Sequence, residues 1–181
     1  TGVFKSTDSG ATWKPANAGI NPNSRVRGVA VARDGKAVFA GSGDGVYLSM
    51  DGGTSWTVAL PKKDVHSVAA GPDGLVLAGT NGDGVLRSAD GGTSWSIAGD
   101  LGSSLYVSAI LVDPAEPSRV LVATDIGVKL STDGGTSFTG ALEGDAVSTP
   151  VRDPLRAGTL FASGRGGLYR SDDRGSSWLR T

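Results

Sequence analysis

The chain has 181 residues and no cysteine, and its 17 Lys and Arg residues nearly balance its 18 Asp and Glu residues. Disulfides, thiol catalysis and zinc–thiolate sites are therefore excluded, and a net charge of −1 gives no general attraction for nucleic acids or anionic lipids. With 29 glycines and only 19% charged residues, the composition favours short strands joined by tight turns. No apolar run approaches the ~20 residues that span a bilayer, so we expect no membrane insertion.

An eight-residue motif, Ser-x-Asp-x-Gly-x-(Ser/Thr)-aromatic, occurs five times and sets the period of the chain. We call each copy a box. The box aspartates recur at steps of 39 to 43 residues and are Asp8, Asp51, Asp90, Asp133 and Asp173. The closing aromatic residues are Trp13, Trp56, Trp95, Phe138 and Trp178. A period of about 40 residues with several short apolar segments is typical of β-propeller blades.

In chain order, residues 1–20 hold the last half of a repeat, and four complete repeats follow at about 25–60, 65–99, 105–141 and 145–181. Each complete repeat has two apolar strands around a turn, a third strand before the box and a fourth after it. The expected strands are 26–31, 37–41, 45–49 and 55–59; 65–69, 75–79, 84–88 and 94–98; 107–112, 120–123, 127–131 and one from 138; 147–151, 159–162, 167–171 and one from 178. Pro150 falls within the strand expected at 147–151, which should be bulged or weakly paired because proline cannot donate to a ladder.

These patterns predict an all-β propeller of four-stranded antiparallel blades, with four complete blades and a terminal hairpin in a single segment, 1–181. Both ends finish on the same part of the repeat, so they cannot complement each other into another blade. We therefore expect an arc of a larger propeller, whose open sheet edges are completed by missing blades or by a neighbouring subunit.

The box itself is expected to be structural. Its Asp can accept hydrogen bonds from N–H groups of the turn, its Gly supplies backbone freedom, and its aromatic ring can wedge between sheets. Five copies of one functional site in so short a chain are less plausible than five copies of a structural turn. Calcium is disfavoured because the boxes lack the pattern of an EF-hand-like loop, in which Asp at alternate positions is followed by a distant Glu. We therefore expect no metal and no cofactor.

Together with the Gly-(Val/Leu)-x-x-Ser strand that precedes them, the boxes resemble Asp-box, or bacterial neuraminidase, repeats. These repeats occur in sialidases, xyloglucanase-type glycoside hydrolases, sortilin-type receptors and photosystem assembly-factor propellers. The resemblance covers nearly the whole chain and implies a propeller with the boxes on the face opposite the ligand site. It also implies a secreted or periplasmic protein.

The resemblance leaves two functional classes open. The sialidase Arg-Ile-Pro motif is absent, and the only glutamates are Glu116 and Glu143. Thr124 to Gly127 is similar to the Thr-Asp-Ile-Gly motif of xyloglucanase-type enzymes, which makes Asp125 a candidate catalytic carboxylate. An inverting hydrolase needs a second carboxylate, for which no motif is recognisable, and Asp125 also matches turn residues in the neighbouring repeats.

The loops expected opposite the boxes join one repeat to the next or connect second and third strands. They are polar and differ between repeats, as loops of a binding face do, and Asp64 and Ser104 are among their residues. The candidate binding residues are Arg25, Arg27, Asp44, His66, Asp83, Tyr106, Asp125 and Arg165. We predict a non-catalytic recognition or scaffold propeller for a protein or glycan partner; the alternative is a glycoside hydrolase that uses Asp125.

Overall fold

The structure, a computed structural model, describes residues 2–181 as eighteen β-strands without a helix. This range accordingly holds no helix long and apolar enough to cross a membrane. A terminal hairpin pairs β1 (Phe4–Lys5) with β2 (Lys14–Pro15). Blade 1 consists of β3 (Val26–Val31), β4 (Val38–Ser42), β5 (Gly45–Ser49) and β6 (Thr57–Pro61). Blade 2 consists of β7 (Val65–Ala70), β8 (Val76–Thr80), β9 (Val85–Ser88) and β10 (Ser96–Ile97).

Blade 3 consists of β11 (Val107–Val112), β12 (Val120–Thr124), β13 (Gly127–Ser131) and β14 (Thr139–Glu143). Blade 4 consists of β15 (Val151–Arg152), β16 (Leu160–Gly164), β17 (Gly167–Ser171) and β18 (Leu179–Arg180). In every blade the strands pair in sequence order and antiparallel. The prediction of four-stranded antiparallel propeller blades is therefore confirmed.

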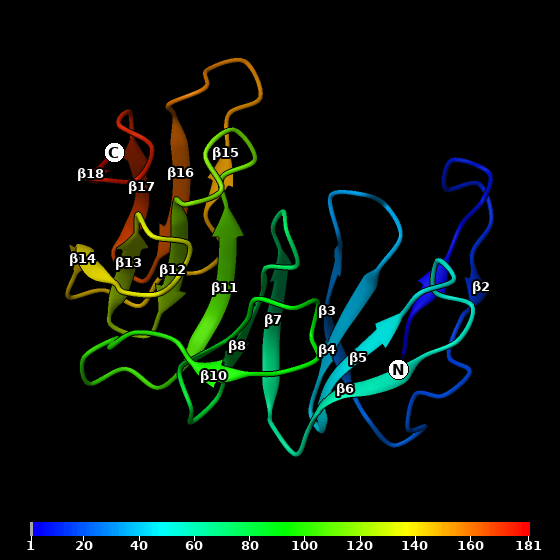
Figure 1. Cartoon of the computed structure of the whole chain (residues 1–181). Coiled ribbons are helices and arrows are strands. Elements are labelled where there is room, and N and C mark those ends of the chain that lie inside the picture. The colour runs from blue at the N-terminus through cyan, green and yellow to red at the C-terminus, as the bar shows by residue number, and fades with distance from the viewer. Residues whose placement is uncertain (1) are drawn as a thin grey trace.

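The sheets follow one another in an arc from the hairpin at the N-terminus to blade 4 at the C-terminus (Figure 1). The first strands of the first three blades follow one another, since β7 contacts both β3 and β11. Within residues 2–181 the sheets do not close into a ring, and the hairpin and blade 4 lie at opposite ends (Figure 1).

Several strands differ in extent from the pattern, most clearly the fourth strands of blades 1 and 2 and the first strand of blade 4. The fourth strand of blade 1 begins at Thr57, two residues later than expected, because Ser55 and Trp56 belong to the box turn. The Ser55 N–H donates to Asp51 at 2.9 Å and the Trp56 N–H to the Ala18 carbonyl at 2.8 Å, so neither is free for the ladder. In blade 4, β15 is only two residues long, and Val147 forms an isolated bridge to Gly164, as expected from Pro150.

The box turn is organised by its Ser and Asp side chains, as blade 2 illustrates. Ser88 Oγ donates to Asp90 Oδ1 at 2.8 Å and accepts the Gly92 N–H at 2.8 Å. Asp90 Oδ1 also accepts the N–H groups of Thr93 and Ser94, at 3.1 and 2.9 Å, while Oδ2 accepts the Ser94 hydroxyl at 2.5 Å. The other four boxes repeat the Ser-to-Asp and hydroxyl-to-Asp contacts, so each turn is stabilised by its own side chains.

In the four blades, the aromatic residue of the box packs against the preceding unit. Trp56 and Trp178 are only 4% and 8% exposed, in clusters with Ile20 and Leu121 of the units before them. Trp95 and Phe138 pack at the edges of the two clusters between. Trp13 departs from the expected wedge. It is 62% exposed, because the described chain has no sheet before the hairpin for its ring to contact.

Candidate functional site

The blades present two different faces. On the box face, the box of a blade lies beside the turn between its first two strands. A backbone hydrogen bond joins them in blades 2, 3 and 4, from Gly91 to Gly74 at 2.9 Å, Gly134 to Ser118 at 2.8 Å and Arg174 to Gly158 at 2.9 Å. The opposite face carries the loops between second and third strands and the connections between blades. All eight candidate residues from the sequence lie at this end of the blades.

Five side chains from three blades meet on the opposite face in a group that we call the Asp64 cluster. Asp64 pairs with Arg27 and accepts a hydrogen bond from Asn81 at 3.3 Å. The His66 ring lies between the Asp64 carboxylate and the Tyr106 hydroxyl. Its Nε2 is 3.4 Å from Asp64 Oδ2, and its Nδ1 is 3.3 Å from the Tyr106 hydroxyl oxygen. The two rings meet edge to face, with centroids 5.1 Å apart. The cluster therefore links the connections that enter blades 1, 2 and 3.

The carboxylate at the centre of the cluster is held ionised. Burial opposes the charge of Asp64, but the Arg27 guanidinium and the hydrogen bonds from Arg27, Asn81 and His66 outweigh it and lower the pKa of Asp64 below its usual value. The side chains of Arg27 and Asp64 remain 26% and 35% exposed, so a ligand can reach them from solvent.

A pocket of about 440 Å³ lies next to the cluster on the same face, between blades 3 and 4. We call it the opposite-face pocket. Its lining includes Tyr106, Ser108, Asp125, Ser148 and Arg165, of which Asp125, Ser148 and Arg165 are exposed. Because Tyr106 belongs both to this lining and to the Asp64 cluster, the two features form one continuous surface.

The remaining candidates are engaged locally. Asp44 accepts hydrogen bonds from Ser24, from Ser42 at 2.6 Å, from Tyr47 at 2.9 Å and from Asn21 at 3.0 Å. Burial opposes its charge, but these donors prevail and lower the pKa of Asp44 to about 2. Such a carboxylate stabilises its loop and has little capacity left for a ligand.

Asp83 and Arg25 also stand outside the continuous surface. Asp83 forms an ion pair with Lys63 at 2.8 Å. The Arg25 carbonyl accepts the Gly43 N–H at 3.2 Å, while Arg25 itself is exposed. The structure thus brings Arg27, His66, Tyr106, Asp125 and Arg165 to one surface, and leaves Arg25, Asp44 and Asp83 beside it.

Asp64, Asn81 and Ser104 belong to the site but were not among the candidate residues from the sequence. Asp64 is the centre of the cluster, and Ser104 donates its hydroxyl to Asp125 Oδ1. Asp64 meets Arg27 and Asn81 across 37 and 17 residues, so their relation depends on the packing of blades. Within residues 2–181, no three His, Cys, Asp or Glu side chains gather closely enough to hold a metal ion.

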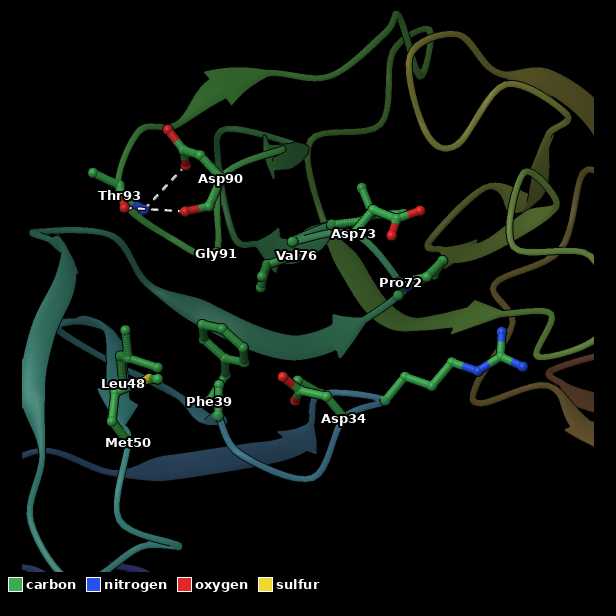
Figure 2. A pocket seen from close by; sticks show the side chains of 16 residues that line it. Asp34, Phe39, Leu48, Met50, Pro72, Asp73, Val76, Asp90, Gly91 and Thr93 are labelled. Carbon is green, nitrogen blue, oxygen red and sulfur yellow. Dashed lines mark hydrogen bonds between the residues drawn. The ribbon is translucent and has the colours of Figure 1, made fainter.

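A larger pocket, of about 730 Å³, lies on the box face between blades 1 and 2 (Figure 2). We call it the box-face pocket. This pocket was not predicted, because the boxes were expected to mark a face without a ligand site. Its lining joins the turns of blades 1 and 2 to the box of blade 2, with Phe39, Met50, Asp34, Asp73 and Asp90 among its residues.

No protein-family model and no curated protein matches the sequence. Solved structures do resemble the fold. The GH74 enzyme of Niastella koreensis has a TM-score of 0.78 at 16% identity, over 98% of this chain and 33% of that one. The GH74 xyloglucanase from Xanthomonas campestris has a TM-score of 0.65 at 17% identity, over 98% and 42%. YCF48 bound to a D1 peptide has a TM-score of 0.64 at 20% identity, over 93% and 57%.

The chain therefore spans between 33% and 57% of the length of these three proteins. At identities of 16% to 20%, the similarity supports the β-propeller fold alone. The three neighbours include both glycoside hydrolases and a protein seen with a bound peptide, so fold likeness does not choose between catalysis and recognition.

Proposed function

We propose that the chain is a non-catalytic recognition or scaffold segment of an Asp-box propeller, and that it binds a protein or a glycan through its opposite face. The observation that carries this proposal is the continuous surface from the Asp64 cluster to the opposite-face pocket, with Tyr106 in both. Box loops of nearly uniform sequence fix the blades at one end, and loops of varied polar sequence lie at the other.

The chemistry of this surface suits a polar partner. Arg27 and Arg165 offer planar guanidinium groups, Asp125 offers an acceptor, and the Tyr106 ring offers an apolar plane with a hydroxyl. These groups bind either the hydroxyls and ring faces of a glycan or the polar side chains of a protein. The proposal requires no cofactor, nucleic acid or membrane insertion, and it places the protein outside the cytoplasm, secreted or periplasmic, on the resemblance of its repeats.

Hydrolysis is less well supported by the same pocket. Glycosidases use two carboxyl groups that flank the scissile bond. Among the described residues that line the opposite-face pocket, Asp125 is the one carboxylate, and its Oδ1 already accepts the Ser104 hydroxyl. The lining therefore supplies one half of the catalytic pair and favours binding over bond cleavage.

We expect Arg165→Ala to weaken partner binding by about tenfold or more, because a charge-assisted hydrogen bond at the pocket is lost. The wild-type chain is first screened on xyloglucan and cello-oligosaccharides and on acidic and basic peptides, and the affinity for the bound probe is then compared between variants. Arg156→Ala is the matched control, since Arg156 is exposed in the β15–β16 turn on the box face.

Equal weakening by Arg165→Ala and Arg156→Ala, or binding to none of these probes, contradicts the proposal. Release of sugars from xyloglucan by the wild-type chain, lost in Asp125→Asn, identifies the hydrolase instead.

We also propose that the open ends of the arc are covered by further blades or by a neighbouring subunit. Trp13 on the hairpin and Leu179 on blade 4 are 62% and 76% exposed, which leaves apolar surface at both ends. We expect light scattering of this 181-residue chain to give a mass above that of the monomer, rising with concentration. A monodisperse monomer over the whole concentration range contradicts this expectation.

A further inference from the structure

The box-face pocket has a floor and one wall of apolar side chains. Phe39 and Val76 form buried parts of the lining, each 1% exposed, and Leu48 and Met50 lie beside Phe39 (Figure 2). Met50 is 66% exposed although it is a large apolar residue. A ligand that covered this wall would remove Met50 and the rim of the pocket from water.

The pocket is open because small residues stand where larger ones fill the corresponding junction of blades 3 and 4. There the remaining cavity is only about 10 Å³. Arg119 and Arg174 line it, together with the ion pair between Asp113 and Arg152 at 3.2 Å.

The equivalent positions around the box-face pocket carry Ala37 for Arg119 and Gly91 for Arg174. The small side chains at positions 37 and 91 therefore leave open the volume that Arg119 and Arg174 occupy between blades 3 and 4.

Carboxylates stand at the other end of the pocket. Figure 2 shows Asp34 and Asp73 on one side of Phe39, while Leu48 and Met50 lie on the other side. Asp34 is exposed and accepts one hydrogen bond, from the Lys36 N–H at 3.0 Å.

Asp73 is also exposed, and within residues 2–181 its carboxylate forms no hydrogen bond or ion pair. Among the described residues the one cation of the lining is Arg33, which the three carboxylates there outnumber. The Asp90 carboxylate, in contrast, is already occupied by the donors of its own box. Two carboxylates with acceptor capacity thus face a ligand at this end.

We propose that the box-face pocket binds a small organic cation with an apolar body. The body lies against Phe39, Leu48 and Met50, and an ammonium or guanidinium group lies at Asp34 and Asp73. A volume of about 730 Å³ falls in the range of small-molecule sites, which are mostly apolar with a few polar groups that orient the ligand. This site is separate from the opposite-face surface, so its test does not depend on the proposed recognition function.

The first test compares three indole compounds of similar shape: tryptamine, which is cationic, N-acetyltryptamine, which is neutral, and indole-3-propionate, which is anionic. In NMR titrations of the full chain, we expect tryptamine to bind and N-acetyltryptamine to bind at least about tenfold more weakly. Indole-3-propionate should not bind.

The double variant Asp34→Asn/Asp73→Asn should reduce tryptamine binding to the level of N-acetyltryptamine. Asparagine tolerates the positive φ of 52° at position 73, so the turn keeps its shape.

A filling variant tests the place of binding. Gly91→Arg reproduces Arg174, which has a φ of 59° in the equivalent position of blade 4, and should abolish the binding of both tryptamine and N-acetyltryptamine. Ser9→Arg makes the equivalent change in the box of the hairpin, where Ser9 has a φ of 56°, and should leave binding unchanged. Equal affinity for the three compounds, unchanged tryptamine binding in the Asp34→Asn/Asp73→Asn or Gly91→Arg variants, or no binding at all overturns the proposal.

Discussion

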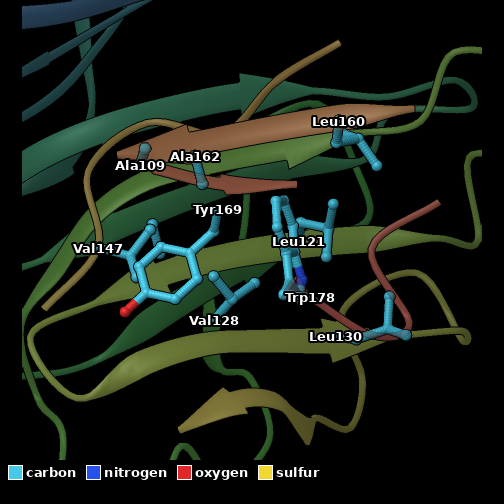
Figure 3. Packing of buried hydrophobic residues seen from close by; sticks show 10 residues of the cluster. Ala109, Leu121, Val128, Leu130, Val147, Leu160, Ala162, Tyr169 and Trp178 are labelled. Carbon is cyan, nitrogen blue, oxygen red and sulfur yellow. The ribbon is translucent and has the colours of Figure 1, made fainter. Parts of the chain in front are cut away.

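Replacing Trp178 with alanine should lower the free energy of unfolding by about 3–5 kcal/mol, whereas Trp13→Ala should change it by less than about 0.5 kcal/mol. Both residues end a box, but their surroundings differ. Trp178 is 8% exposed in a cluster of ten buried residues that joins blades 3 and 4, and it lies against Leu121 (Figure 3). Trp13 is 62% exposed, so its truncation opens no cavity.

The comparison isolates packing because the polar contacts of the two indoles match. Trp178 Nε1 donates to the Gly175 carbonyl at 3.2 Å, and Trp13 Nε1 donates to the Gly10 carbonyl at 3.1 Å. Urea denaturation of the two variants and the wild type measures the difference. Equal losses of stability would show that the indole acts within its own box and not as a contact between blades.

The fold was predictable because its determinants are local and repeated. In each box the Ser hydroxyl and the Asp carboxylate bind donors no more than four residues away, so the sequence pattern contains the whole turn. The strand order follows directly, since every blade is built from consecutive strands. Weak pairing in the first strand of blade 4 was expected from the missing N–H of Pro150, although the strand was expected at 147–151 and β15 covers only Val151–Arg152.

The site was less predictable because its contacts cross blades. Nothing in the segment around Asp64 indicates that it meets Arg27, and Tyr106 reaches His66 across 40 residues. The same limit applies to Trp13 and Trp178, which look alike in sequence and differ in burial because the partner of a box aromatic belongs to the preceding unit.

The box-face pocket shows the limit most clearly. Its space depends on the absence of arginines such as Arg119 and Arg174, which stand 55 residues apart in sequence and meet only at a junction of blades. A repeat alignment displays Ala37 and Gly91 as ordinary small residues. Only their position beside Phe39 and Asp73 gives them a role in forming a cavity.

The box carboxylates should make the fold sensitive to acid. Hydrogen bonds from the side chain and backbone of Ser94, followed by that from Ser88, lower the pKa of Asp90 from 3.8 to about 2. The Thr12 side chain and backbone, followed by Ser6, lower the pKa of Asp8 to about 2 in the same way. The pKa values of Asp51 and Asp133 are lowered further, by their contacts with Ser55 and Ser137.

A folded-state pKa below the unfolded value means that the ionised carboxylate stabilises the folded chain, and that this contribution is complete above the unfolded pKa. We therefore expect the free energy of unfolding, measured by urea denaturation from pH 7 downward, to fall as the pH drops from about 4 to about 2. Asp90→Asn should be less stable than the wild type at pH 7, and the difference should shrink over the same interval, because protonation removes from Asp90 the charge that the variant already lacks. A difference that stays constant down to pH 2 would mean that the Asp90 carboxylate contributes by its shape and not by its charge, and that acid sensitivity arises elsewhere in the chain.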